Sequence, residues 1–265
     1  MVTAMDYDTE WREQMRGFDH ANDAAAYWNK RAISYDSIWR TSTYAQELLH
    51  RMELSAEYTV LDIACGTGVM AIPLAKKVSH VTALDISPLM LDRVKMRVNT
   101  EDISNVSFIN RDWNQVVIGR DVSVHDVALI SRSLPNITLS ATLDKINQAV
   151  RSGCYITWRA ERFDTYEAEY REAIGKRQRV HPDYRIIVGM LDNMGISARV
   201  EIFQAHNEEN FPTLEAAVLN MAKSDEINQR QFENLMTVAK KRLKLRDGYY
   251  TSKSTINWAL ISWLK

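Results

Sequence analysis

Short apolar runs alternate with longer amphipathic stretches through the middle of this chain. Five apolar runs predict buried strands, at residues 59–63, 81–85, 106–109, 127–130 and 154–158. Three stretches with apolar residues at helical spacing predict the helices between them, at residues 69–77, 88–98 and 139–150. Strands that alternate with helices in this way indicate βαβ units and a parallel sheet.

The flanks of this alternation predict mainly helices. Residues 1–57 contain few helix breakers and are expected to form an N-terminal helical cap on a core over 58–158. The expected later elements are helices at 164–176, 183–194 and 213–245 and strands at 199–203 and 255–263. We therefore predict one domain over 1–265, with helical lid insertions at about 160–181 and 205–250.

Composition narrows the class of protein. The net charge of −1 and the 25% of charged residues give no overall field that would attract nucleic acid or an anionic membrane. No apolar run is long enough to span a membrane, and the first residues do not have the pattern of a signal peptide. Cys65 and Cys154 fall in predicted core elements, so we expect free thiols and a cytoplasmic protein. The histidines and cysteines have no metal-ligand spacing, and we expect no metal site.

The candidate chemistry lies in the turn after the first predicted strand. Gly66 and Gly68 allow a sharp turn and a close approach of the backbone to a ligand. The segment Gly66–Ala71 fits the loose dinucleotide pattern, with Asp85 as a ribose ligand, which favours NAD. Asp62 favours another cofactor, because its carboxylate would repel a pyrophosphate but would attract the cationic amino acid and sulfonium of S-adenosylmethionine.

Four segments, in order, resemble the motifs of class I S-adenosylmethionine-dependent methyltransferases. They are Asp62-Ile-Ala-Cys-Gly-Thr-Gly68, Val81–Met90, Phe108–Trp113 and Asp126–Ser133. Ala64 stands where the family usually has the first glycine of its turn. The resemblance implies a Rossmann-like, doubly wound α/β fold, with a seven-stranded, mostly parallel sheet and an antiparallel C-terminal strand. It also implies S-adenosylmethionine as the cofactor and S-adenosylhomocysteine as the product.

The resemblance assigns cofactor contacts by position. It implies that Asp85 binds the ribose hydroxyls and that Asp112 takes the adenine amino group, with Trp113 beside it. Ile86 and Met90 are candidates to enclose the adenine. Each has a structural alternative: Asp85 as the cap of the helix that starts near residue 88, Asp112 as a turn residue, and the apolar pair as ordinary core.

Further candidates lie on the N-terminal helix and at the end of the fourth strand. Tyr27, Arg31 and Tyr35 share one helical face, and Arg31 is a candidate partner of the cofactor carboxylate. An amphipathic helix packed on the sheet explains them equally well. Ser131 is a candidate contact of the amino-acid end of the cofactor, whereas Arg132 is expected to be a solvated loop residue.

The acceptor of the methyl group is less defined than the donor. A pocket under a helical lid favours a small molecule over nucleic acid, and no residue is singled out as catalytic. A methyltransferase that acts on RNA or protein is the alternative, which the basic segment 240–246 leaves open, although a solvated helix end explains that segment better. An NAD-dependent oxidoreductase and a non-catalytic S-adenosylmethionine-binding module are the remaining hypotheses.

Overall fold

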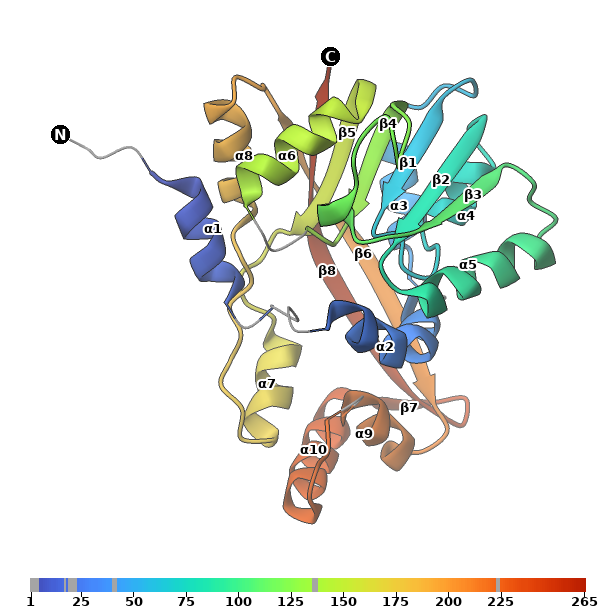
Figure 1. Cartoon of the computed structure of the whole chain (residues 1–265). Coiled ribbons are helices and arrows are strands. Elements are labelled where there is room, and N and C mark those ends of the chain that lie inside the picture. The colour runs from blue at the N-terminus through green and yellow to red at the C-terminus, as the bar shows by residue number, and fades with distance from the viewer. Residues whose placement is uncertain (1–4, 17, 19–22, 40–41, 135–137, 223–224) are drawn as a thin grey trace.

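A single mixed sheet organises the molecule (Figure 1). The computed structural model describes residues 5–16, 18, 23–39, 42–134, 138–222 and 225–265. The strands are β1 (Thr59–Ile63), β2 (His80–Asp85), β3 (Val106–Asn110), β4 (His125–Ser131), β5 (Val150–Arg159), β6 (Arg199–Phe211), β7 (Lys244–Arg246) and β8 (Tyr249–Leu264). Their order is β3-β2-β1-β4-β5-β8-β6, with β7 paired to β8.

The direction of each strand confirms the predicted fold class. β1 to β5 pair in parallel, whereas β8 runs antiparallel to both of its neighbours, β5 and β6. The short strand β7 adds an eighth strand to the seven that were expected. The order places the switch in winding direction between β1 and β4, which is where open α/β sheets bind their ligands.

Helices cover both faces of the sheet. They are α1 (Tyr7–Met15), α2 (Ala24–Trp39), α3 (Tyr44–Arg51), α4 (Ala71–Ala75), α5 (Pro88–Thr100), α6 (Leu139–Gln148), α7 (Thr165–Ala173), α8 (Tyr184–Asn193), α9 (Leu214–Ala222) and α10 (Gln229–Arg242). One apolar core joins α1, α6 and α8 to the sheet, and a second joins α3, α4 and α5 to its other face. In β1, Leu61 belongs to the first core and Val60 to the second, because successive side chains of a strand point to opposite faces.

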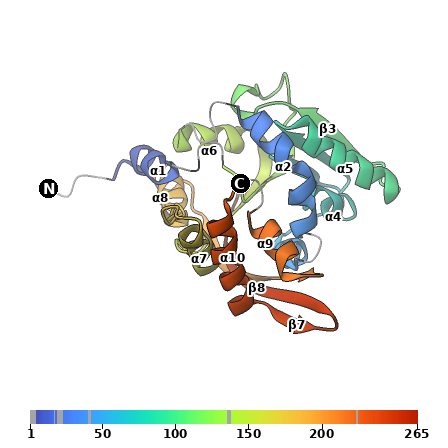
Figure 2. The ribbon, with the colours of Figure 1, turned by 90° about the horizontal axis from the view of Figure 1, so that it is seen from below.

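The last two long strands extend past the rest of the sheet as a two-stranded ribbon. β6 and β8 pair over thirteen residues, from Arg199↔Ser262 to Phe211↔Tyr250. The far end of this ribbon packs on a third apolar cluster formed by α7, α9 and α10. The view from below shows these three helices side by side at that end of the molecule (Figure 2).

The single helix expected over 213–245 was wrong. The segment contains α9 and α10, followed by β7. Asn228 starts α10 with a capping box, in which its side chain accepts from the Gln231 N–H and the Gln231 side chain accepts from the Asn228 N–H. At the other end, Leu243 has an extended backbone, and the expected helix end at 240–246 is partly strand.

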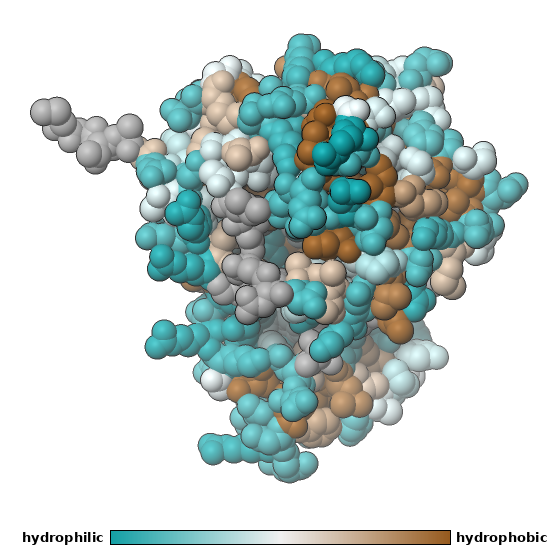
Figure 3. All heavy atoms as spheres, in the orientation of Figure 1, coloured by the Kyte–Doolittle hydropathy of each residue, from teal (hydrophilic) through white to brown (hydrophobic). Residues whose placement is uncertain are grey.

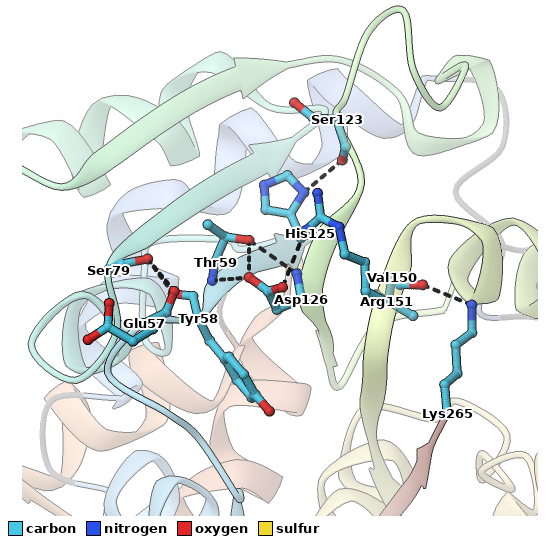
Figure 4. Close-up of polar contacts among 10 residues, drawn as sticks. All are labelled: Glu57, Tyr58, Thr59, Ser79, Ser123, His125, Asp126, Val150, Arg151 and Lys265. Atoms are coloured by element: carbon cyan, nitrogen blue, oxygen red, sulfur yellow. Dashed lines mark hydrogen bonds and ion pairs between the residues drawn. The ribbon is translucent and has the colours of Figure 1, made fainter.

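Polar side chains tie together the amino ends of the strands, opposite the carboxyl ends (Figure 4). The Asp126 carboxylate accepts from the Thr59 N–H at 2.8 Å and lies 3.2 Å from an Arg151 guanidinium nitrogen. His125 is buried, and its Nδ1 lies 2.8 Å from the carbonyl of Ser123. Since a carbonyl can only accept, Nδ1 carries the proton and Nε2 is left to accept from the Thr82 hydroxyl at 2.8 Å.

This arrangement makes the stability of the protein depend on His125 below neutral pH. Burial lowers the pKa of His125 from its ordinary value near 6.5, so the unfolded chain binds the extra proton more readily than the folded one. We expect the wild type to lose stability relative to the His125→Gln variant as the pH drops through 6.5, so that the difference in melting temperature between the two proteins changes with pH. Thermal unfolding between pH 8 and pH 5 measures it. His206→Gln, at an exposed histidine, is the control and should leave the pH profile unchanged; equal slopes in all three proteins would contradict the assignment.

Candidate functional site

A cavity of about 720 Å³ lies at the carboxyl ends of the central strands. It is lined by the ends of β1, β2, β4 and β5, by the turns that follow them, and by α2. Eleven of the thirteen residues predicted to bind the cofactor line it: Tyr27, Tyr35, Asp62, Ala64, Gly66, Asp85, Ile86, Met90, Asp112, Trp113 and Ser131. The parallel strands explain this gathering, because their carboxyl ends meet at one edge of the sheet.

The turn after β1 has the left-handed backbone conformation that favours glycine. Ala64, Gly66 and Gly68 all have positive φ, of 56°, 56° and 79°. A Cβ added at Gly68 would come within 2.8 Å of a Val94 methyl carbon, so this glycine allows α5 to pack against the turn. Gly68 therefore shapes the turn from outside the cavity lining. Ala64 adopts a conformation that costs an alanine about 1–2 kcal/mol.

Asp85 holds the turn in place. One carboxylate oxygen accepts from the Gly66 N–H at 2.8 Å, and the other accepts from the Ser87 N–H at 2.8 Å. Ser87, not Asp85, caps α5, because its hydroxyl accepts from the Met90 N–H. The capping alternative for Asp85 is thus wrong. Each carboxylate oxygen keeps a lone pair for a further donor in the cavity.

Asp62 is a buried carboxyl group without a close hydrogen-bond partner. It is 1% exposed, and neither of its oxygens has a partner at normal hydrogen-bond geometry among the described residues. Burial and the negative charge of Asp85 raise the pKa of Asp62 to about 8, while the guanidinium of Arg132 and the backbone N–H of Ala71 act in the opposite direction. The group is therefore protonated at neutral pH in the ligand-free protein, and a cation placed beside it would favour its ionised form.

Arg132 lies in the loop after β4, as expected, and it also lines the cavity. Its backbone has a φ of 61°, and its N–H donates to the Thr157 hydroxyl at 3.1 Å. Its guanidinium lies 4.4 Å from the centre of the Tyr44 ring. The Tyr44 hydroxyl is within 2.8 Å of the Ser131 hydroxyl and 2.5 Å of the Thr157 hydroxyl, which fixes the end of β4 against α3 and β5.

The remaining predicted residues form the rim of the cavity beyond β2 and β3. Asp112 caps the short 3-10 helix η1 (Trp113–Gln115) by accepting from the Asn114 N–H at 2.9 Å. The turn role expected as its alternative is therefore present, and one oxygen of the carboxylate is used for it. Met90 is buried, and Ile86 is partly exposed. Both side chains line the cavity as well as packing locally.

Two of the three residues predicted to share one face of the N-terminal helix lie at the cavity, on α2. Tyr27 and Tyr35 line the cavity. Arg31 lies outside its lining, and its guanidinium is 4.3 Å from the centre of the Tyr27 ring. Its pairing with a cofactor carboxylate stays a prediction.

Several lining residues were missed in the sequence. The most informative are Trp28, Trp158 and Arg179. Trp158 is the second-last residue of β5, so the rule that ligands bind at strand ends could have found it. Trp28 follows Tyr27 directly. It was missed because the candidates on this helix were chosen by a spacing of four residues, which excludes a direct neighbour. Arg179 is the one lining residue from the predicted insertion at 160–181, and none of the described residues in 205–250 lines the cavity.

The residues present fit S-adenosylmethionine. An unpartnered buried carboxyl group suits the cationic end of this cofactor, and it would disfavour a pyrophosphate at the same turn.

Within the described part of the chain, no group of three or more His, Cys, Asp or Glu side chains is placed to hold a metal ion. Cys65 and Cys154 are free and buried, as expected. In the same part of the chain, no helix has the length and apolar character needed to cross a membrane.

Comparison with known proteins agrees with this site. Residues 60–153 match the family model described as a methyltransferase domain. An uncharacterised protein of Haemophilus influenzae is 26% identical over 259 residues, which cover 96% of this chain and 94% of that protein. The human tRNA (uracil-5-)-methyltransferase homolog A is 29% identical over 106 residues, but these cover 37% of this chain and 17% of the human protein.

Solved structures agree on the fold. A candidate methyltransferase from Bacillus halodurans superposes with a TM-score of 0.58 at 13% identity, covering 83% of this chain and 98% of that one. Two further structures of this fold, with TM-scores of 0.52 and 0.56, hold S-adenosylhomocysteine. The family model covers residues 60–153, which contain the cofactor turn, and the strand order and cavity chemistry agree with it. This part of the chain is therefore a methyltransferase domain of the S-adenosylmethionine-dependent type, with a Rossmann-like fold.

Proposed function

We propose that the protein transfers the methyl group of S-adenosylmethionine to a small organic molecule bound in the same cavity. The observation that supports this acceptor class is the cavity itself, whose 720 Å³ extends from the acidic strand ends to an aromatic wall. That volume lies within the range of about 300–1,000 Å³ typical of small-molecule sites. Tyr27 and Trp28 of α2 also line the cavity, so it is roofed by the N-terminal part of the chain.

The acidic half of the cavity would hold the cofactor. Asp85 would accept from the ribose hydroxyls with its remaining lone pairs, as a charge-assisted bidentate contact. Asp112 would accept from the adenine amino group, with Ile86 and Met90 against the ring. Asp62 would face the cationic amino-acid end.

The bound cofactor supplies a methyl group already activated by a positively charged sulfur. The chain then has two tasks, which are to orient the acceptor toward that methyl group and to exclude water. Ser131 and Arg132 line the cavity at the end of β4. In the sheet, β4 lies between β1, which carries Asp62, and β5, which carries Trp158. We assign no general base, because a base is required only for acceptors that must lose a proton.

An RNA acceptor is the second candidate. The similarity to the human tRNA methyltransferase favours it, although this chain spans only 17% of that relative's length. A methyl-transfer assay with labelled S-adenosylmethionine distinguishes the small-molecule acceptor from the RNA acceptor. It compares the label transferred to a metabolite extract with the label transferred to total tRNA. Label found only in tRNA would overturn the small-molecule acceptor.

The ribose contact gives a direct test at Asp85. Asp85→Ala should weaken the binding of S-adenosylhomocysteine by about 1.5–3 kcal/mol, because charge-assisted hydrogen bonds are lost. Isothermal titration calorimetry measures the change. Asp85→Asn keeps one acceptor oxygen for the turn, and its affinity should lie between those of the wild type and Asp85→Ala. Asp92→Ala, at an exposed acid on α5, is the control and should bind like the wild type. Unchanged affinity in a folded Asp85→Ala protein would show that this carboxylate does not contact the cofactor.

The raised pKa of Asp62 predicts a pH dependence of cofactor binding. The ammonium group of S-adenosylhomocysteine would require the ionised carboxylate beside it, so binding below pH 8 must release the proton that Asp62 carries in the free protein. We expect the affinity for S-adenosylhomocysteine to rise with pH, by up to about tenfold per pH unit, and to level off above about 8.

Calorimetry between pH 6 and pH 9, in buffers of different ionisation enthalpy, measures both the affinity and the released proton. The Asp62→Asn variant cannot release this proton and should show a flatter profile. A wild-type affinity that does not change with pH would exclude the proposed contact with the amino group.

A further inference from the structure

A second groove, rich in arginine, opens beside the cofactor cavity. It has a volume of about 600 Å³ and is lined by Arg16, Arg162, Arg171, Arg177 and Arg179. Phe18 and Arg179 line both the groove and the cavity, so the two spaces are adjacent. In the space-filling view, the surface between α1 and α7 is largely hydrophilic (Figure 3).

The positive charge of this groove is only partly balanced by the protein, since Glu167 interacts with Arg171 and Arg179, and Asp183 interacts with Arg162. Arg171 lies 3.8 Å from a Glu167 oxygen, which is a loose ion pair. No carboxylate of the described residues lies within 4 Å of the other four guanidinium groups, and Glu13 is the one acid among the lining residues. Several arginines elsewhere in the chain are paired more closely, as in Arg51–Glu201, Arg159–Asp164 and Arg242–Glu169, although Arg97 and Arg111 form only long ion pairs. What distinguishes the groove is that five arginines line one concave site, where their mutual repulsion favours an anionic ligand.

Local contacts hold three of these side chains in position. The Arg171 Nε donates to the carbonyl of Arg177 at 2.5 Å, and the Arg162 Nε donates to the carbonyl of His181 at 3.4 Å. The Arg179 guanidinium lies 5.1 Å from the centre of the Phe18 ring. Each contact leaves other guanidinium N–H groups available, and these donate well to the oxygens of carboxylate and phosphate.

An aromatic wall connects the groove to the strand ends. Four aromatic side chains line the cavity, and we call them the aromatic wall: Trp28 and Tyr35 of α2, Trp158 of β5, and Phe18. Trp158 is fixed because its indole N–H donates to the Pro182 carbonyl at 2.8 Å. Flat aromatic walls favour a flat apolar ligand, since aromatic rings stack at low entropic cost.

We propose that the methyl acceptor is a small organic anion. Its flat apolar body lies along the aromatic wall, and its carboxylate or phosphate is bound by the arginine groove. This inference rests on the proposed small-molecule function and adds the charge of the acceptor to it. The groove is a single hollow of limited length on a protein of net charge −1, whereas RNA binding needs a basic track that follows many phosphates.

Calorimetry with simple probes tests the inference in the protein loaded with S-adenosylhomocysteine. The probes are phenyl phosphate and benzoate, which carry the two candidate anions, and phenol, which carries none. We expect one or both anions to bind, phenol to bind at least about tenfold more weakly, and the Arg177→Gln/Arg179→Gln variant to lose at least about tenfold in affinity for the anion.

The controls separate this inference from the function on which it rests. Arg199→Gln, at an exposed arginine on β6, should bind the probes like the wild type. Failure of S-adenosylhomocysteine to bind the wild type would overturn the proposed function itself. Normal cofactor binding without binding of either anion, or with equal binding by the double variant, would overturn the anionic acceptor alone. A short single-stranded RNA that binds in a salt-dependent and arginine-dependent manner, while phenyl phosphate does not, would replace it with an RNA acceptor.

Discussion

Two carboxyl groups, buried side by side where β1 and β2 end, set the electrostatics of this protein. Asp85 is stabilised by two backbone N–H groups, whereas Asp62 has no close hydrogen-bond partner among the described residues. In a medium of low dielectric constant, the second negative charge is unfavourable until a cation arrives. The ligand-free site is therefore prepared for a positively charged group at Asp62 and for hydroxyl groups at Asp85, which is the combination that S-adenosylmethionine offers.

The cavity is polarised along its length. Asp62 and Asp85 lie at the ends of β1 and β2, and Asp112 follows β3 together with Arg111, whereas Arg132 follows β4 and Arg179 comes from the segment after β5. The acidic side chains thus gather on the β1–β3 side of the cavity, and two of its three arginines lie on the other side. A cationic donor and an anionic acceptor would each be drawn to its own end, so that attraction between protein and ligands also sets their relative orientation.

The sequence was most informative where periodicity and chemistry coincide. The central strands and the cofactor turn were predicted closely, because fully buried strands are continuous apolar runs that end in polar residues. The lengths of β6 and β8 were underestimated, since their outer halves leave the sheet and consist mostly of polar residues without the alternation that predicts a strand. The break between α9 and α10 was missed, although the pair Asn228 and Gln231 is a readable capping box. The place of Arg132 in the cavity depended on the register of β4 against β5, because tertiary pairing decides which strand ends share a cavity.

The third apolar cluster has a consequence for how such proteins diversify. Its residues on α7, α9 and α10 pack with one another at the far end of the β6–β8 ribbon, apart from the two cores that carry the sheet. Mutations there can accumulate with little effect on the nucleoside-binding half, since distant sites without shared contacts act independently. Descendants of this chain could therefore remodel that appendage rapidly while inheriting the donor chemistry intact.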